Sequence, residues 1–117
     1  MSTEDRSDTI HALHECYGIC LETFSVHCVK MGGDHMAREH IRRMLSCIDL
    51  CALTADSLLR RFPLTQEICD LCAEICKQCA ASCEGFDNPR MRRCARACEE
   101  AARVCLNESY HLKSIAA

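Results

Sequence analysis

Cysteine and apolar residues recur along this chain at intervals of three, four and seven positions, which is the spacing of one face of an α-helix. The clearest case is the segment CDLCAEICKQCAASC, where Cys69, Cys72, Cys76, Cys79 and Cys83 step 3-4-3-4. These five thiols form a single stripe over more than three helical turns. No segment alternates apolar and polar residues as a half-buried strand does. The pattern therefore predicts an all-α protein.

Glycine and proline divide the chain into four helices. Gly32-Gly33 ends the first helix, Pro63 follows the second, and Gly85 follows the third. The expected helices cover about 3–31, 34–62, 65–84 and 88–113 of a single domain, 1–117. Three short connections make successive helices antiparallel, which predicts an up-down-up-down four-helix bundle with a Cys-lined core.

The residues after each break are suited to cap the helix that follows. Asp34 and Thr65 are candidate N-caps for the second and third helices. Asp87 or Asn88 can cap the fourth, where Pro89 fits the first turn.

Length and charge exclude several classes of protein. The 117 residues fit one domain, and a net charge of −3 with both signs interspersed argues against nucleic acid as a partner. No apolar run approaches the roughly 20 residues that span a membrane. The polar, acidic start of the chain has no secretory signal, so we expect a cytoplasmic protein; the alternative is an exported form whose signal has been removed.

The thirteen cysteines favour reduced thiols over disulfides. Five pairs lie four positions apart, in CYGIC, CIDLC, CAEIC, CAASC and CARAC. Such positions on a helix have Cβ atoms about 5–6 Å apart. A disulfide requires about 3.8 Å between Cβ atoms, so bridging these pairs would distort the helices.

Antiparallel packing arranges the cysteines in three layers. We call the end that holds residues 32–33 and 85–88 the mouth, and the opposite end the floor. The layer nearest the mouth contains Cys28, Cys79, Cys83 and Cys94. The middle layer contains Cys20, Cys47, Cys72, Cys76 and Cys98, and the deepest contains Cys16, Cys51, Cys69 and Cys105. The result is a column of sulfur roughly 20 Å long.

The two ends of this column differ in chemistry. At the mouth, His40 and Met44 continue the Cys47/Cys51 stripe and are candidate metal ligands, although buried Met also serves as ordinary packing. Further soft or nitrogen donors near the mouth are His27, Met31, His35, Met36 and Met91. The floor is expected to be an apolar plug of Leu13, Leu58, Phe62, Leu64, Ile68, Tyr110 and Leu112. This asymmetry predicts loading from one end with a thiophilic metal.

Charge balance indicates which metal. A closed Cys₄ zinc site carries a net charge of −2, and the thiol stripes contain no Lys or Arg to compensate several such sites. Monovalent Cu(I) accepts two or three sulfur ligands, and one Cu(I) per thiolate leaves the core neutral. We therefore predict multiple Cu(I) ions, on the order of one per cysteine.

Three other functions remain open at this point. One is a zinc- or cadmium-buffering thiol bundle, another is a structural or redox-buffer bundle without metal, and the third is an iron–sulfur carrier using Cys69, Cys72, Cys76 and Cys79. No triad, carboxylate pair or open three-ligand metal arrangement stands out, so we expect the protein not to be an enzyme.

The repeated Cys-x-x-x-Cys pairs and the five-cysteine third helix resemble those of the copper storage proteins, over nearly the whole chain. The resemblance implies a bundle that holds many Cu(I) ions in its interior, a homotetramer, and copper entering past His and Met at the open end. A copper chaperone or acceptor protein would be its partner. Cytosolic members usually carry more cysteines than this chain and exported members carry a similar number. By the resemblance, the Cu(I) ligands are Cys16, Cys20, Cys28, Cys47, Cys51, Cys69, Cys72, Cys76, Cys79, Cys83, Cys94, Cys98 and Cys105.

Overall fold

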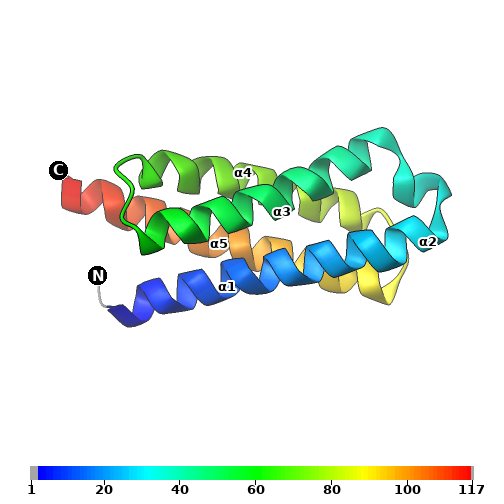
Figure 1. Cartoon of the computed structure of the whole chain (residues 1–117), viewed down its shortest axis with the longest axis horizontal. Coiled ribbons are helices and arrows are strands. Elements are labelled where there is room, and N and C mark those ends of the chain that lie inside the picture. Colours follow the sequence, from blue (N-terminus) through cyan, green and yellow to red (C-terminus); the bar gives the residue numbers. More distant parts are fainter. Residues whose placement is uncertain (1–2, 117) are drawn as a thin grey trace.

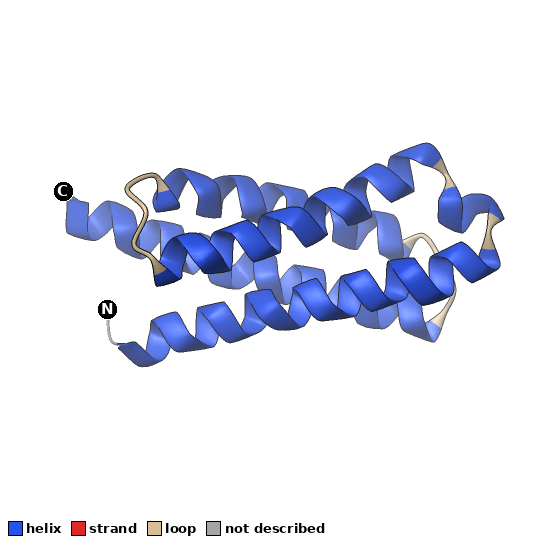
Figure 2. Cartoon of the chain, in the orientation of Figure 1, coloured by secondary structure: helices blue, strands red, loops and turns tan. Residues whose placement is uncertain are grey.

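Four long helices run antiparallel along one axis (Figure 1). The computed structural model describes residues 3–116, where all regular structure is helical (Figure 2). The long helices are α1 (Thr3–Glu22), α3 (Arg38–Leu59), α4 (Thr65–Glu84) and α5 (Pro89–Ala116). Between α1 and α3 lie a π-helical turn, η1 (Thr23–Cys28), the short α2 (Val29–Met31) and a 3₁₀ turn, η2 (Gly33–Met36). The predicted up-down-up-down four-helix bundle is confirmed.

The helices form a square in cross-section. Helices α1 and α4 each pack against both α3 and α5. The Cα envelope measures 48 × 23 × 20 Å. Both ends of the chain lie beside the α3–α4 turn at the floor, while the α1–α3 and α4–α5 connections form the mouth (Figure 1). This geometry places one residue stripe from each helix on the central axis.

The core is built mainly from sulfur and methyl groups. On α4 the cysteine stripe is buried together with Ala73 and Ala80, whereas Glu74 and Lys77 point to solvent. Small side chains on facing helices allow the backbones to approach closely, and Cys behaves as a small hydrophobe when buried. Among residues 3–116, no helix combines the length and the apolar character needed to cross a lipid bilayer.

The π-helical turn η1 changes the register of the first helix. A π turn holds one residue more than an α turn, so it rotates the following residues back by about 100°. In an unbroken α-helix, Cys28 would lie about 80° around the axis from Cys20. The extra residue reduces this to about 20°, and Cys28 is completely buried, with 0% of its surface exposed. The π turn therefore returns Cys28 to the thiol stripe.

The connection after α2 departs from the expected helix boundaries. Gly32 and Gly33 both have positive φ, at 64° and 51°, as their lack of a Cβ permits. Asp34 lies in the 3₁₀ turn η2 and does not cap α3, which begins at Arg38 after the extended residue Ala37. The second helix thus starts four residues later than residue 34.

The α3–α4 turn is stabilised by hydrogen bonds from the Thr65 side chain to two backbone carbonyl oxygens. Helix α3 ends at Leu59, before residue 62, and Arg61 has a φ of 53°. Thr65 lies in the first turn of α4 without capping it through its side chain. Its hydroxyl instead donates to the carbonyl oxygens of Phe62 and Ser57. This ties the start of α4 to the last turn of α3.

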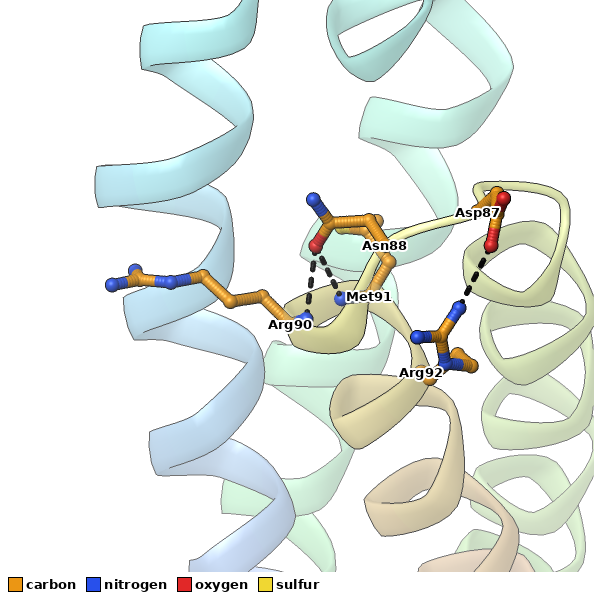
Figure 3. Close-up of polar contacts among 5 residues, drawn as sticks. All are labelled: Asp87, Asn88, Arg90, Met91 and Arg92. Atoms are coloured by element: carbon orange, nitrogen blue, oxygen red, sulfur yellow. Dashed lines mark hydrogen bonds and ion pairs between the residues drawn. The ribbon is translucent and has the colours of Figure 1, made fainter.

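Helix α5 is capped by Asn88, one of the two expected candidates. The Asn88 Oδ1 accepts hydrogen bonds from the backbone N–H groups of Arg90 and Met91, at 2.9 and 3.2 Å (Figure 3). Asp87 instead pairs with Arg92 at 2.9 Å on the surface. The cap fixes the first turn of α5 and, with it, the position of Met91 at the mouth.

Replacing Asn88 by Ala should lower the free energy of unfolding by about 1 kcal/mol, because two N–H groups at the start of α5 lose their acceptor. Urea denaturation of the reduced protein measures this change. Asp87→Ala is the matched control and should leave stability nearly unchanged, since its ion pair is exposed to solvent. Equal losses in both variants would contradict the assignment of the cap.

Candidate metal centre

Every cysteine of the chain is buried and free of disulfide bonds. Twelve have none of their surface exposed, and Cys16 has 1%. Thiols that face a closed interior are shielded from water and pack as small hydrophobic side chains. They become metal ligands when a thiophilic ion reaches them and displaces the thiol proton. The prediction that the thiols face inward is confirmed.

Six thiols at the middle of the bundle form two overlapping groups of four. The first group contains Cys16, Cys20, Cys47 and Cys98, and the second contains Cys16, Cys47, Cys51 and Cys76. Within each group all sulfur atoms lie within 4.8 Å of one another. The two groups share Cys16 and Cys47, whose sulfur atoms are 3.9 Å apart. All four long helices contribute to this cluster.

The cluster continues toward both ends of the bundle. Toward the mouth, the Cys94 sulfur lies 3.3 Å from that of Cys20. Toward the floor, the Cys72 sulfur lies 3.8 Å from that of Cys76. Hydrogen bonding with Cys69 and Cys72, together with burial, raises the pKa of Cys105 at the deepest level. The sulfur atoms therefore form one connected column rather than isolated thiols.

The structure moves two cysteines out of the expected deepest layer, because Cys16 and Cys51 both belong to the four-thiol groups at the middle of the bundle. Cys16 does not join the deepest layer but lies 3.9 Å from both Cys47 and Cys98 of the middle layer. Its sulfur is also 3.8 Å from that of Cys20. Counting residues from the loops misplaces Cys16 because the π turn and the η2 connection change the axial offset between α1 and α3.

A second type of site lies between the thiol column and the mouth. Around the Cys28 sulfur are the Nε2 of His40 at 3.7 Å, the Sδ of Met44 at 3.8 Å and the Sδ of Met91 at 3.9 Å. All four side chains are buried. One thiol, one imidazole and two thioethers form a soft donor set suited to Cu(I). We call these four residues the mouth cluster.

Met91 belongs to this cluster, although the stripe containing His40 and Met44 does not single it out. The signal for it lies on another helix, where Met91, Cys94, Cys98 and Cys105 follow a helical repeat. The Asn88 cap sets the first turn of that helix. Among the methionines near the mouth, its place on the stripe of Cys94 and Cys98 is the signal that distinguishes it.

Ser82 orients the imidazole of His40. The Ser82 Oγ lies 2.7 Å from the Nδ1 of His40, which directs Nε2 toward Cys28. Burial lowers the pKa of His40, with a further contribution from His35. A neutral imidazole with a free Nε2 lone pair is the form that binds metals.

The remaining mouth residues lie outside the mouth cluster. The ring of His35 is 4.1 Å from that of Phe86 and 5.1 Å from that of His27, and Phe86 also contacts His40 at 4.8 Å. Met31 is exposed to solvent. The rings of His27, His35 and Phe86 thus form an aromatic layer beside His40.

The floor is less apolar than expected. Leu13 and Leu58 are buried there, but Leu64 and Tyr110 are exposed, at 54% and 75% of their surface. Buried polar side chains share this end of the bundle, and they are Thr54, Ser57, Glu108 and Ser109. The Ser109 hydroxyl donates to Asp70, and this hydrogen bond is the main cause of the lowered pKa of Asp70. The expectation of an apolar plug was wrong because two of its residues are exposed and buried polar side chains stand beside the apolar ones.

The electrostatics of the column favour binding of cations with low charge. No Lys or Arg among residues 6–115 is buried. Burial raises the pKa of Cys28 to about 11. Hydrogen bonding with Cys16 raises the pKa of Cys20, and the same contact lowers the pKa of Cys16. Metal ions must therefore displace thiol protons and supply the only positive charge in the core.

The sequence of residues 2–110 matches the family described as copper storage protein. The chain belongs to the copper storage protein family. The match spans α1, α3, α4, most of α5 and all thirteen cysteines.

Individual relatives of this copper storage protein agree in sequence and in fold. This chain is 33% identical over 96 residues to the uncharacterized cysteine-rich protein YhjQ of Bacillus subtilis. The alignment covers 82% of this chain and 88% of the relative. The Nmul_A1745 protein of Nitrosospira multiformis superposes with a TM-score of 0.88 at 31% identity, covering 93% and 98% of the two chains. The Cu(I)-bound copper storage protein BsCsp3 of Bacillus subtilis gives 0.81 at 31% identity, covering 88% and 96%.

Replacing His40 by Gln should make the stability of the reduced protein less sensitive to acid. Because the folded pKa of His40 is lowered, there is a range of pH below about 6.5 in which His40 binds a proton in the unfolded chain but not in the folded protein. This costs the native protein up to about 1 kcal/mol at pH 5.5, and nothing well above pH 7.

Urea unfolding at pH 7.5 and 5.5 measures the difference between the two proteins. His14→Gln, at an exposed position, is the matched control and should retain the wild-type pH dependence. An identical loss of stability in wild type and His40→Gln would contradict a buried neutral imidazole.

Proposed function

We propose that this protein stores several Cu(I) ions, on the order of one per cysteine, as thiolate complexes inside the bundle. One observation carries the proposal: a connected column of buried thiols spans the core, and among residues 6–115 no buried Lys or Arg accompanies it. Loading one Cu(I) per thiolate keeps such an interior neutral. Each ion bound displaces about one thiol proton.

The spacing of the thiols supports bridged Cu(I). Neighbouring sulfur atoms in the column lie between 3.3 and 3.9 Å apart. Copper bound by two or three sulfur atoms can share each thiolate with a neighbouring ion, so a connected set holds more ions than isolated four-ligand sites would. The proposed role is reversible binding rather than catalysis.

The proposed ligands comprise the column and the mouth cluster. They are the thirteen cysteines named above, together with His40, Met44 and Met91. The thioethers and the imidazole bind Cu(I) without losing a proton at neutral pH. They are therefore suited to pass an ion inward to thiols that must be deprotonated.

Two of the alternative functions fit the arrangement less well. An iron–sulfur cluster is normally wrapped by a loop, whereas Cys69, Cys72, Cys76 and Cys79 lie along the continuous helix α4. A purely structural role leaves the mouth cluster unexplained, because hydrophobic side chains would fill the same volume without reactive sulfur.

Assembly, location and partners complete the proposal. The family resemblance implies a homotetramer, and Leu45 and Leu59 on α3 are exposed apolar residues available to such an interface. A cytoplasmic location suits thirteen reduced thiols. A copper chaperone or acceptor protein would deliver or remove ions at the mouth.

Anaerobic titration of the reduced protein with Cu(I) against a competing chelator tests the storage role. We expect saturation near one ion per cysteine, and a capacity lower by roughly two ions in Cys47→Ala/Cys51→Ala. Ser46→Ala/Asp49→Ala, on the outer side of α3, is the matched control and should keep the full capacity. Saturation at three or four ions would refute the proposal.

Replacing Met44 and Met91 together by Leu should slow copper loading several-fold while changing the final capacity by no more than one ion. Leu keeps the buried volume and removes both thioether donors. Stopped-flow mixing with a coloured Cu(I) complex measures the rate. Met31→Leu serves as the control because Met31 is exposed. Unchanged loading in the double variant would show that the mouth cluster is not on the path.

A further inference from the structure

We propose that, in the absence of copper, the middle of the bundle holds two Zn²⁺ ions in a binuclear six-thiolate centre bridged by Cys16 and Cys47. Each ion would occupy one of the two overlapping four-thiol groups. This inference goes beyond copper storage, because it concerns a divalent metal, a fixed stoichiometry of two and only six of the thirteen thiols.

The distances between sulfur atoms match those of a tetrahedral zinc site. A Zn–S bond of about 2.3 Å corresponds to an S···S edge of about 3.8 Å in a regular tetrahedron. In the first group, Cys16 lies 3.8 Å from Cys20 and 3.9 Å from Cys98, and Cys47 lies 3.7 Å from Cys98. In the second group, Cys76 lies 3.7 Å from both Cys47 and Cys51. Both groups therefore need little rearrangement to take up zinc.

The shared edge determines how the two sites are related. Cys16 and Cys47 belong to both groups, and their sulfur atoms are 3.9 Å apart. Two tetrahedra that share an edge use six ligands, not eight. Among the described residues, only these two groups bring four possible ligand atoms within 4.8 Å of one another. The geometry thus limits zinc to two ions, although thirteen thiols could in principle supply three separate Cys₄ sites.

Bridging also reduces the charge that must be buried. Two separate Cys₄ zinc sites would carry a total charge of −4, whereas six thiolates around two divalent ions carry −2. The outer thiols can stabilise this remainder through S–H···S hydrogen bonds. Cys94 lies 3.3 Å from the terminal ligand Cys20, and Cys72 lies 3.8 Å from the terminal ligand Cys76. Both donors lie outside the two groups.

Zinc binding and copper binding then differ in their proton balance. Six thiols and two Zn²⁺ give the binuclear centre and six protons, which is three protons per ion. Cu(I) releases about one proton per ion and leaves no net charge. Copper should therefore displace both zinc ions, and the zinc form would serve as a resting state that protects the central thiols from oxidation.

The test is a titration of the full-length, reduced, copper-free protein with Zn²⁺ against a chromophoric chelator. We expect two ions bound per chain and their complete release when Cu(I) is added. In the same protein loaded with ¹¹³Cd²⁺, we expect two NMR signals typical of four thiolate ligands. These two signals should show mutual scalar coupling, which is transmitted only through shared sulfur.

Variants separate the shared ligands from the terminal ones. Cys47→Ser removes a ligand from both groups, so this variant should no longer bind two ions. Cys51→Ser removes a ligand from the second group only, so it should retain one ion in the first group. Cys69→Ser is the matched control: Cys69 is buried in the same column but belongs to neither group, so two ions should remain. Circular dichroism confirms that each variant is still helical.

Four results would overturn the inference. Three of them are saturation at three or more zinc ions, two uncoupled ¹¹³Cd signals, and retention of both ions by Cys47→Ser. A protein that binds no zinc but saturates near thirteen Cu(I) would also overturn it, while leaving copper storage intact. Binding of two zinc ions with a copper capacity of only three or four ions would support the zinc centre and refute copper storage. The two proposals can therefore fail separately.

Discussion

The contact among thiols across the bundle axis is the interaction on which the rest of this structure depends. Cys16 and Cys47 lie at its centre and each contacts thiols from other helices. Thiols are smaller and less effective core fillers than Leu or Ile, so this interior is less well suited to stability than an aliphatic one. A dense set of sulfur atoms in a closed interior is instead suited to hold ions that compensate its charge.

The same constraint explains the division of the bundle along its axis. In the column, every donor is a thiol that must lose a proton before it binds metal. In the mouth cluster, His40, Met44 and Met91 need not, and the Ser82 hydrogen bond holds His40 with Nε2 directed inward. At the floor, polar side chains lie among the apolar ones, and the Ser109 hydroxyl donates a hydrogen bond to Asp70. Donor chemistry therefore changes from proton-independent to proton-dependent along the path that copper would follow.

Much of this arrangement could be predicted from local patterns. The stripe from Cys69 to Cys83 predicts its own helix and buried face, and the breaks at Gly32-Gly33 and Pro63 predict the antiparallel order. The stripe of His40, Met44, Cys47 and Cys51 also predicts which α3 side chains are buried. These features depend on a helical repeat within one element, and a repeat can be read without knowledge of the neighbouring helices.

What the sequence determined by itself is the helical class, the antiparallel topology and the inward direction of every thiol except Cys28, because all three follow from the helical repeat and from the glycine and proline breaks. Only the tertiary structure decided which thiols meet. The π turn from Thr23 to Cys28 returns Cys28 to the stripe, and no residue in this segment predicts the extra residue of the turn. The axial offset between α1 and α3 puts Cys16 beside Cys47 and not in the deepest layer. Such offsets arise from packing between helices, so the sites that share ligands exist only in the folded bundle.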